Sequence, residues 1–467
     1  MTRTSPLYSK DPRAEQSLRR SVRDGVAYSV MAGTGETYIS AYALFLKASA
    51  SQISWLTALP ALLGSLSQIA SAWLSRCTGR RKPIILFGVM LQALMWLPII
   101  WLPYLFPHQA VPILIACVAL YQTGASLATP AWSSLMGDLV PARRRGRFFA
   151  NRSRLMSLTT FFALAGGGLA LHLSKAGGNT RLGFTLVFAL ALLARLYSAW
   201  QLARMHEPAP AAPAAPVPAP DLKLPLSASP FVRFTLFHAA MQCAAAIAAP
   251  FFAVYMLRDL HFSYLQYMVS IGLAVLAQFG TLRLWGRLGD IFGNRLILSV
   301  TGFVIPVFPV MWLVSSNFWY VLALQMFGGW CWAGFSLSAG NYLYDTTPPA
   351  RRAAYTAVHN LLASSAVFAG ALFGGLLSTV APDTIHLFGH PLRWTSSLWA
   401  VLLVSTLARA VVSLISIPQL REVRPVRPIS AAGLMLRFAR FNALSQLVLA
   451  GMARGRRHWR AFSQARA

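Results

Sequence analysis

Long apolar runs constrain this chain more than any other feature of its sequence. They recur between residues 25 and 417, and each has at least about 20 residues, the length that an α-helix needs to cross the hydrocarbon core of a bilayer. Only 11% of the residues are charged, whereas soluble globular chains carry about 25%. We therefore expect an all-α membrane protein with twelve transmembrane helices. These lie near residues 25–46, 52–75, 83–106, 111–137, 148–174, 182–204, 232–257, 264–286, 295–315, 317–344, 353–380 and 394–417.

The basic residues indicate the orientation of the chain. The formal net charge is +29, and Lys and Arg cluster in alternate loops between the apolar runs, as in Arg80, Arg81 and Lys82. The intervening loops hold only a few of them: Lys47, Lys175, Arg181, Arg258 and Arg393. This positive-inside pattern predicts a multi-pass protein of the cytoplasmic (inner) membrane with both termini in the cytoplasm.

The same distribution identifies the expected partner of the positive charge. Basic residues near an anionic inner leaflet each gain about 1 kcal/mol, so the lipid bilayer is the expected partner. We expect no nucleic-acid partner, because the basic residues neither follow amphipathic surface helices nor alternate with aromatic residues that could stack on bases.

A proline-rich segment divides the chain into two halves. Residues 206–230 read HEPAPAAPAAPVPAPDLKLPLSASP, and alternating proline favours extended polyproline geometry over helix. We expect a six-helix half at residues 1–205, a cytoplasmic linker at 206–230, a second six-helix half at 231–420 and a basic cytoplasmic tail at 421–467. The tail mixes apolar and Arg positions at helical spacing, so it is either an interfacial helix or a solvated segment.

The two halves repeat each other. Asp138 returns as Asp345, and the pair Gly167-Gly168 returns as Gly374-Gly375, both at the same separation along the chain. At a slightly larger separation, Tyr42 matches Tyr255 and Gly79 matches Gly293. Repeated six-helix halves are typical of transporters whose substrate site lies at the interface between the repeats.

One loop gives the repeat a family resemblance. Residues 286–295, GRLGDIFGNR, resemble the motif G-x-x-x-D-x-x-G-x-R of the major facilitator superfamily, which joins the second and third helices of a half. The first-half copy keeps Gly79 and its basic run but has Arg76 where the family places Asp. The resemblance covers about residues 20–420. It implies two pseudo-symmetric six-helix halves, secondary transport by alternating access, and a central cavity lined by spans one, four, seven and ten.

Glu36 is the main candidate for the transport chemistry. It lies near the middle of the first span, where an ionisable group costs at least a few kcal/mol and is a functional hypothesis by default. Ser29, Gly33, Glu36 and Ser40 share one face of a continuous helix, and we expect that face to turn toward the bundle interior. Glu36 could bind a cationic group, carry a coupling proton, or both. The alternative is a structural Glu hydrogen-bonded to a neighbouring helix.

Other polar residues in the predicted spans are weaker candidates for the substrate or proton site. They lie in spans four, seven and ten, which the resemblance assigns to the cavity, but small and polar stripes also serve close helix packing. These candidates are Gln122, Thr129, His238, Gln242, Ser336 and Asn341.

Charged loops at the predicted cytoplasmic side are candidates for gating. Similar transporters lock that side with ion pairs, and ordinary surface pairs are the alternative. We expect three contacts: Asp138 with Arg80 or Arg81, Asp345 with Arg295, and Asp290 with Arg147 or a nearby helix N-terminus. The full gating set is Arg80, Arg81, Asp138, Arg147, Gly286, Asp290, Gly293, Arg295, Asp345 and Arg351.

The sequence carries no signal of catalysis. It has no P-loop, no G-x-S-x-G elbow and no metal-ligand spacing, so we expect neither an enzyme nor a cofactor or metal. The most consistent function is secondary active transport of a small solute by a monomer, coupled to protons, with efflux and uptake both open. The alternatives are a flippase of a lipid or amphiphile and a non-transporting membrane sensor or scaffold. The scarcity of charges in the spans favours a neutral, amphipathic or weakly cationic solute over a polyanion.

Overall fold

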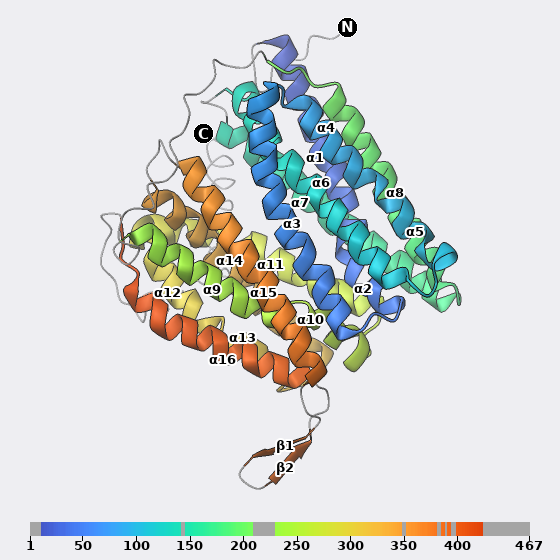
Figure 1. Ribbon diagram of the computed structural model, residues 1–467, viewed down its shortest axis with the longest axis vertical. Coiled ribbons are helices and arrows are strands. Elements are labelled where there is room, and N and C mark those ends of the chain that lie inside the picture. The colour runs from blue at the N-terminus through green and yellow to red at the C-terminus, as the bar shows by residue number, and fades with distance from the viewer. Residues whose placement is uncertain are drawn as a thin grey trace, which may run out of the picture.

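The computed structural model describes residues 11–141, 145–208, 229–347, 352–380, 384–387, 390–393 and 398–423. Their helices form twelve passes in two sets of six (Figure 1). Ten of these described passes are long and apolar enough to span a bilayer by composition alone. The other two are the interrupted first pass and the tenth, which is rich in Gly, Ser and aromatic residues. The fold is thus an all-α membrane bundle, as the apolar runs predict.

The first half consists of α1 to α8. Their bounds are α1 Pro12–Thr34, α2 Ile39–Phe45, α3 Ala50–Thr78, α4 Lys82–Leu94, α5 Trp96–Leu105, α6 Ala110–Leu139, α7 Arg145–Ala176 and α8 Thr180–Ala203. A short 3-10 helix, Glu36–Tyr38, lies between α1 and α2.

The second half consists of α9 to α16. Their bounds are α9 Pro230–Ala248, α10 Phe251–Val254, α11 Tyr264–Phe292, α12 Asn294–Val304, α13 Val307–Met311, α14 Phe318–Thr346, α15 Arg352–Val380 and α16 Leu398–Ser416. A π-helical turn, Tyr255–Asp259, follows α10, and a 3-10 turn, Ile417–Gln419, follows α16.

The first helix begins earlier than the apolar run alone predicts. It starts at Pro12 rather than near residue 25, because Asp11 caps its N-terminus and accepts a hydrogen bond from the backbone N–H of Arg13. Glu15 and Arg19 then form an i, i+4 ion pair at 3.0 Å. Hydropathy cannot reveal such an extension, since these residues stabilise a helix without making it apolar.

Several passes are interrupted where proline removes a backbone donor. Pro98 has no N–H to offer the carbonyl of Leu94, and α4 ends at Leu94. Pro250 separates α9 from α10, and Pro306 separates α12 from α13. Passes three, seven and nine therefore each consist of two helical pieces.

The first pass is interrupted without a proline. Gly35 ends α1, and a Cβ atom at this position would overlap the indole ring of Trp96. Glycine is thus required by the close approach of α5, and the 3-10 turn that begins at Glu36 follows directly. This interruption changes the direction in which Glu36 points, so the predicted stripe on one continuous helix does not form.

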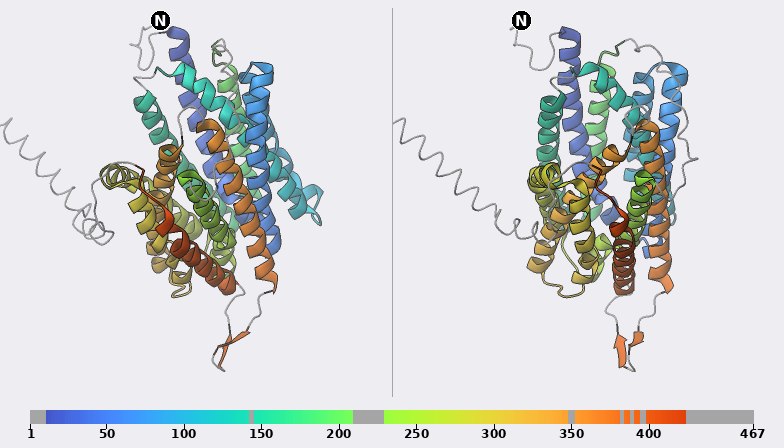
Figure 2. Two further views of the ribbon diagram at one scale, coloured as in Figure 1. Left: turned by 60° about the vertical axis from the view of Figure 1, so that its left-hand side comes forward. Right: turned by 90° about the vertical axis from the view of Figure 1, so that its left-hand side faces the viewer.

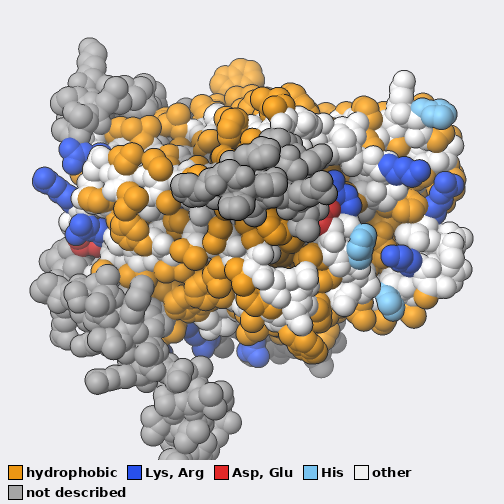
Figure 3. Space-filling model, turned by 90° about the horizontal axis from the view of Figure 1, so that it is seen from below, with side chains coloured by type: hydrophobic (Ala, Val, Ile, Leu, Met, Phe, Trp, Pro, Cys, Tyr) orange, Lys and Arg blue, Asp and Glu red, His pale blue; other side chains and the backbone are white. Residues whose placement is uncertain are grey.

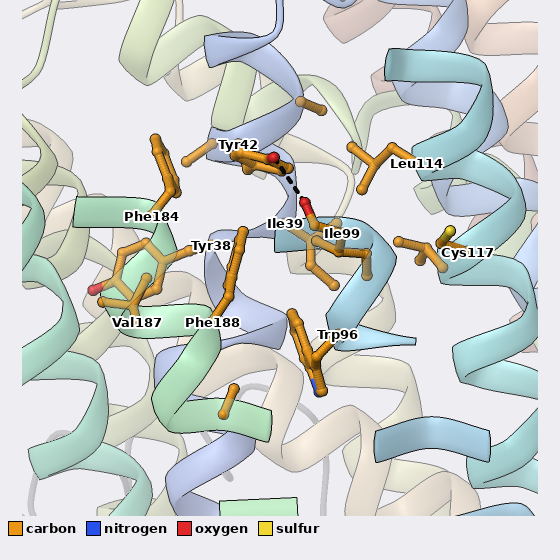
Figure 4. Packing of buried hydrophobic residues seen from close by; sticks show 14 of the residues in the cluster. Tyr38, Ile39, Tyr42, Trp96, Ile99, Leu114, Cys117, Phe184, Val187 and Phe188 are labelled. Carbon is orange, nitrogen blue, oxygen red and sulfur yellow. Dashed lines mark hydrogen bonds between the residues drawn. The ribbon is translucent and has the colours of Figure 1, made fainter. Parts of the chain in front are cut away.

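The largest apolar cluster of the first half packs around this interruption (Figure 4). The ring of Tyr42 lies 5.0 Å from that of Phe184 and 4.9 Å from that of Phe188. Its hydroxyl donates to the carbonyl of Ile99 at 2.8 Å. That carbonyl would otherwise lack its helical donor, because the residue four positions later is Pro103.

The two ends of the bundle differ in character. Lys82 and its neighbouring arginines lie at the end where the chain begins, which we call the basic end. A β-hairpin, which was not predicted from the sequence, lies at the other end, the hairpin end (Figures 1 and 2). Its strands, β1 Thr384–Leu387 and β2 His390–Arg393, pair antiparallel. Seen from this end, hydrophobic side chains cover much of the surface, and Lys and Arg are scattered (Figure 3).

The halves contact each other mainly through two pairs of helices, and α10 also contacts α2 and α3. α3 packs along α15, where the rings of Trp55 and Phe368 lie 6.1 Å apart and Gly375 fits against Ser54. α7 packs against α11, where a Cβ atom at Gly168 would overlap Met268. These side chains lie in the segments of α3, α15, α7 and α11 that run from the middle of the bundle toward the hairpin end.

Some sequence predictions fall outside the described residues. These are most of the linker (209–228), the tail from residue 424, and Arg351; the side chain of Arg147 is also not described.

Candidate functional site

Glu36 lies inside the first half, against α6. The hydroxyl of Tyr121 donates to Oε1 of Glu36 at 2.5 Å, and the rings of Tyr121 and Trp96 meet edge to face at 5.2 Å. A short hydrogen bond to a carboxylate inside an aromatic shell is strong, because donor and acceptor are shielded from water. The interruption at Gly35 therefore directs Glu36 at a specific phenol group of a neighbouring helix.

A second buried carboxylate lies earlier on α1. Asp24 is 4% exposed, and its Oδ1 accepts from Ser198 Oγ on α8 at 2.6 Å. Its Oδ2 lies 3.4 Å from a guanidinium nitrogen of Arg152 on α7. Arg195 on α8 donates to the same Ser198 oxygen at 2.8 Å. One serine thus links a buried aspartate to a buried arginine.

Aromatic rings hold the two arginines of this cluster in place. The guanidinium of Arg195 lies 5.1 Å from the ring centre of Tyr28, and that of Arg152 lies 4.5 Å from the ring centre of Trp132. Cation–π contacts of this kind contribute about 2 kcal/mol where the cation is desolvated. They occupy one face of each guanidinium and leave its edge, which carries the N–H groups, for hydrogen bonds.

The cluster lines a cavity of about 220 Å³ inside the first half. Asp24, Arg152 and Arg195 supply its charges, Tyr28 and Trp132 its aromatic walls, and Thr129 of α6 a hydroxyl. Arg195 is 5% exposed, and its Nε has no hydrogen-bond partner among the described residues. The cavity therefore offers an ionic binding surface within membrane-spanning helices.

The second half carries a matching arginine in a different environment. Arg409 on α16 is the repeat equivalent of Arg195 and is 2% exposed. It donates to the carbonyls of Ile305, at 3.5 Å, and Ala245, at 3.3 Å. Pro309 cannot offer Ile305 the helical N–H, so this carbonyl accepts instead from the N–H of Phe308, at 3.2 Å, and from Arg409 where pass nine is interrupted. The same repeat position thus has a structural use in one half and lines an ionic cavity in the other.

His238 belongs to a cluster of aromatic rings in the second half. Its imidazole stacks on that of His359 from α15, with ring centres 4.8 Å apart, and on Phe335 from α14 at 6.0 Å. His359 is buried, and its Nδ1 lies 3.1 Å from the hydroxyl of Thr235. Only His238 of this histidine pair was predicted from the sequence.

Several predicted site residues lie apart from the charged cluster. Ser29 donates to the carbonyl of Gly25 on its own helix at 2.9 Å. Gln122 faces Gly64 of α3, which packs close to it. Thr129 is the exception, since it lines the cavity. No hydrogen bond among the described residues joins Glu36 to Ser40 on α2, to Gln242 on α9, or to Ser336 and Asn341 on α14.

At the basic end, the first half is closed by two acidic residues. Arg81 donates to Oδ2 of Asp138 at 2.6 Å, which is one of the two pairings expected for Asp138. The backbone N–H of Arg81 donates at 2.7 Å to Oε1 of Glu207, which follows α8. Lys82 begins α4 and also donates its N–H to this oxygen at 3.3 Å. A carboxylate there complements the positive end of the helix dipole.

The second half repeats this arrangement. The backbone N–H of Arg295 donates at 2.9 Å to Oε2 of Glu422, which follows α16. Gly293 has φ +90° and leaves no space for a Cβ atom beside Glu422. Asp345 accepts a hydrogen bond from Nδ2 of Asn294 at 3.0 Å. The partner expected from the sequence is Arg295, the next residue along the chain. In each half, an acidic residue that follows the sixth pass thus accepts a hydrogen bond from a backbone N–H at the start of the third pass.

The remaining gating candidates lie on the surface of the basic end. Arg80 and Asp290 are exposed. Gly286 lies on α11, where a Cβ atom would make only an ordinary contact with Leu337 at 3.8 Å. Their role in gating stays a prediction.

The family of the chain follows from its match to a known model. The model of the Major Facilitator Superfamily matches residues 25–244 and again residues 234–465. The chain belongs to the Major Facilitator Superfamily. Each half of this superfamily member thus corresponds to a match of its own. No curated protein matches the chain.

Solved transporters share this Major Facilitator fold at low sequence identity. A D-xylose-proton symporter is 14% identical, with a TM-score of 0.65, over 89% of this chain and 99% of its own. A bacterial homologue of the iron transporter ferroportin, in an inward-facing state, is 14% identical, with a TM-score of 0.63, over 88% and 99%. The nucleoside transporter NupG is 12% identical, with a TM-score of 0.60, over 88% and 100%.

These likenesses concern the fold, and together with the family they show a multi-pass membrane transporter rather than an enzyme. These likenesses do not identify the solute of this chain.

The charged cluster was not predicted from the sequence. Asp24 precedes the predicted first span, and Arg152 lies near the start of the predicted fifth span, next to a run of arginines typical of a basic loop. Arg195 lies inside a predicted span, where a single charge is averaged away among leucines and alanines. The available signal was the repeat itself, because Arg195 and Arg409 have the same separation along the chain as Gly79 and Gly293.

Proposed function

We propose that the protein is a proton-coupled secondary active transporter that moves a small solute across the cytoplasmic membrane by alternating access. The observation that supports this best is the set of ionisable side chains inside the first half: Glu36, Asp24, Arg152 and Arg195. Charges inside membrane-spanning helices are costly and mark ion or substrate pathways. The chain has no nucleotide-binding loop, so the drive would come from an ion gradient.

Within this proposal, Glu36 carries the coupling proton. Its one hydrogen bond among the described contacts comes from a neutral donor, Tyr121, so Glu36 can take up a proton without losing an ion pair. Asp24, in contrast, is held by Arg152 and Ser198. The interruption of the first pass at Gly35 is a local hinge next to Glu36. Movement at this hinge would let Glu36 exchange Tyr121 for another hydrogen-bond partner.

The proposal also assigns the two ends of the bundle. The positive-inside rule places the basic end, with the linker and both termini, in the cytoplasm. The charged contacts described at that end each stay within one half, as in Arg81 with Asp138 and Asn294 with Asp345. The described contacts between halves run from the middle toward the hairpin end. The conformation therefore corresponds to a transporter closed on the outside and separated on the cytoplasmic side.

The test is proton movement in proteoliposomes that contain the full-length protein. A pH-sensitive dye inside the vesicles reports proton flux as solutes are added. We expect solute-dependent flux in the wild type, loss of that flux in Glu36→Gln, and normal flux in Glu15→Gln. The control removes a carboxylate from the start of the same pass, where Glu15 pairs with Arg19.

Two results would contradict the proposal. Solute uptake without proton flux in the wild type would refute proton coupling. Unchanged proton flux in Glu36→Gln would make Glu36 structural and would move the coupling role to His238 or to Asp24.

A specific observation favours one alternative, the handling of a lipid or amphiphile. A second cavity of about 410 Å³ lies between α1, α7 and α8, with apolar walls that include Val30, Phe162 and Leu190. Phe162 is 68% exposed on the bundle surface. Lipid-dependent flux without proton movement in the same vesicles would support this alternative.

A further inference from the structure

We infer that the transported solute carries a single negative charge, such as one carboxylate, and that this group binds Arg195 in the cavity of the first half. The inference rests on the proposed transport function and names the chemical class of its solute. It replaces the expectation of a neutral, amphipathic or weakly cationic solute, which followed from the small number of charges visible in the predicted spans.

An arginine that lines the cavity has an unsatisfied donor, which calls for an acceptor. Arg195 is 5% exposed and lines the cavity, and its Nε–H has no acceptor among the described residues. Leaving a buried N–H without an acceptor costs about 1–3 kcal/mol, and more for a charged group. An anionic oxygen in the cavity would supply the acceptor, and the planar fork of a guanidinium matches a carboxylate.

The charge of the cavity lining has the sign that an anion requires. Two guanidinium groups, of Arg152 and Arg195, face one carboxylate, that of Asp24. The lining therefore carries one excess positive charge. A cationic solute would meet two like charges in a poorly solvated space, whereas an anion would complete a second ion pair.

The guanidinium groups are also oriented before a ligand arrives. Tyr28 and Trp132 each cover one face of a guanidinium, at 5.1 and 4.5 Å from the ring centres. Ser198 fixes one nitrogen of Arg195 at 2.8 Å. The remaining edge of Arg195 is thus held in advance of binding, which reduces the entropy lost when a ligand binds.

Size limits the solute further. The cavity of about 220 Å³ is smaller than the roughly 300–1,000 Å³ typical of sites for drug-sized ligands. It accommodates a small carboxylate or the charged end of a larger solute.

The charges also connect the anion to the proton. Glu36 does not line the cavity, but when it is ionised it balances the one excess positive charge of the lining. Tyr121 donates a hydrogen bond to Glu36, which also interacts electrostatically with Tyr28 and with Arg195, and the charge of Arg195 acts on both carboxylates. An added anion leaves the site with one excess negative charge, which a proton on Glu36 removes. The solute and the proton would then cross together with no net charge.

The test measures binding to purified full-length protein by titration calorimetry. The probes are matched pairs that differ only in charge: glycolate with glycolamide, lactate with lactamide, and benzoate with benzamide. We expect at least one carboxylate to bind about 10-fold or more tightly than its amide, and more tightly at mildly acidic than at neutral pH. Glu36→Gln, which resembles the protonated form, should bind the anion at neutral pH as the wild type does in acid.

Variants of the arginine locate the anion. Arg195→Gln should abolish the preference for the carboxylate, whereas Arg181→Gln, at the exposed start of the same helix, should retain it. The double variant Asp24→Asn/Arg195→Gln removes both charges and tests the site if the single variant does not fold.

Each outcome decides the inference. Equal binding of acid and amide, no binding of any carboxylate in the panel, or an undiminished preference in Arg195→Gln would overturn it. If Arg195→Gln loses the preference for the carboxylate but the wild type shows no solute-dependent proton flux in vesicles, the anion site is retained and the transport function is rejected. Proton-coupled flux of neutral solutes alone would retain transport and reject the anion site.

Discussion

The glycine that precedes α12 allows a prediction whose size follows from its geometry. Gly293 has φ +90° and ψ 154°, a region that is essentially confined to glycine and costs other residues about 1–3 kcal/mol. A Cβ atom there would also overlap the carboxylate of Glu422. Gly293→Ala should therefore displace that carboxylate from the N–H of Arg295, which costs about a further 1–2 kcal/mol. The total loss of unfolding free energy is about 2–5 kcal/mol.

The repeat supplies a matched control. Gly79 occupies the equivalent loop with φ 63° and ψ 3°, and no atom of the described residues lies within 4 Å of its added Cβ. Gly79→Ala should cost only the ordinary left-handed penalty of about 1–2 kcal/mol. Unfolding by sodium dodecyl sulfate in mixed micelles, followed by tryptophan fluorescence, measures both variants against the wild type.

A double variant separates the two contributions to the Gly293 effect. In a Glu422→Ala background the overlap is absent, so Gly293→Ala should cost only its backbone share of about 1–3 kcal/mol. Equal losses in Gly293→Ala and Gly79→Ala, or the same loss with and without Glu422, would refute the reasoning.

Three other side chains allow shorter predictions. Tyr42→Phe should lower the unfolding free energy by about 1–3 kcal/mol, because the buried carbonyl of Ile99 loses its donor; the same micelle assay checks it. Asp24→Asn should cost about 3–5 kcal/mol by leaving buried guanidinium groups without a carboxylate, and combination with Arg152→Gln should restore part of the loss in thermal melts. Asp290→Asn should leave membrane insertion intact and alter the transport rate in vesicles; wild-type transport would exclude a gating role.

The architecture could be predicted from sequence because a bilayer leaves few alternatives. Each apolar run of about 20 residues must be a helix, since no other structure satisfies its backbone in lipid. The repeated residues then predict the two halves, and the basic loops predict which helix ends lie on the same side of the membrane. The contact of Asp138 with Arg81 could be anticipated for the same reason, because loops at one end of a bundle lie near each other.

The site was harder to predict, because it depends on how helices face each other. Glu36 was found from its charge alone, but its partner Tyr121 depends on the interruption at Gly35. That interruption has its cause in the indole ring of Trp96, which belongs to a different pass of the chain. Asp24 meets Arg195 only because α1 and α8 pack together. A single sequence contains the residues of such a cluster but not the rotations that bring them together.

The two acids that follow the sixth and twelfth passes have a consequence for how the chain can be divided. Glu207 ties the end of the first half to the start of α4, and Glu422 does the same for α12. In each half, the segment after the last helix is thus held by a contact within that same half. The covalent connection between residues 208 and 229 would then be dispensable for assembly, and two separately translated polypeptides, cut within it, should find each other in the membrane and form the complete transporter.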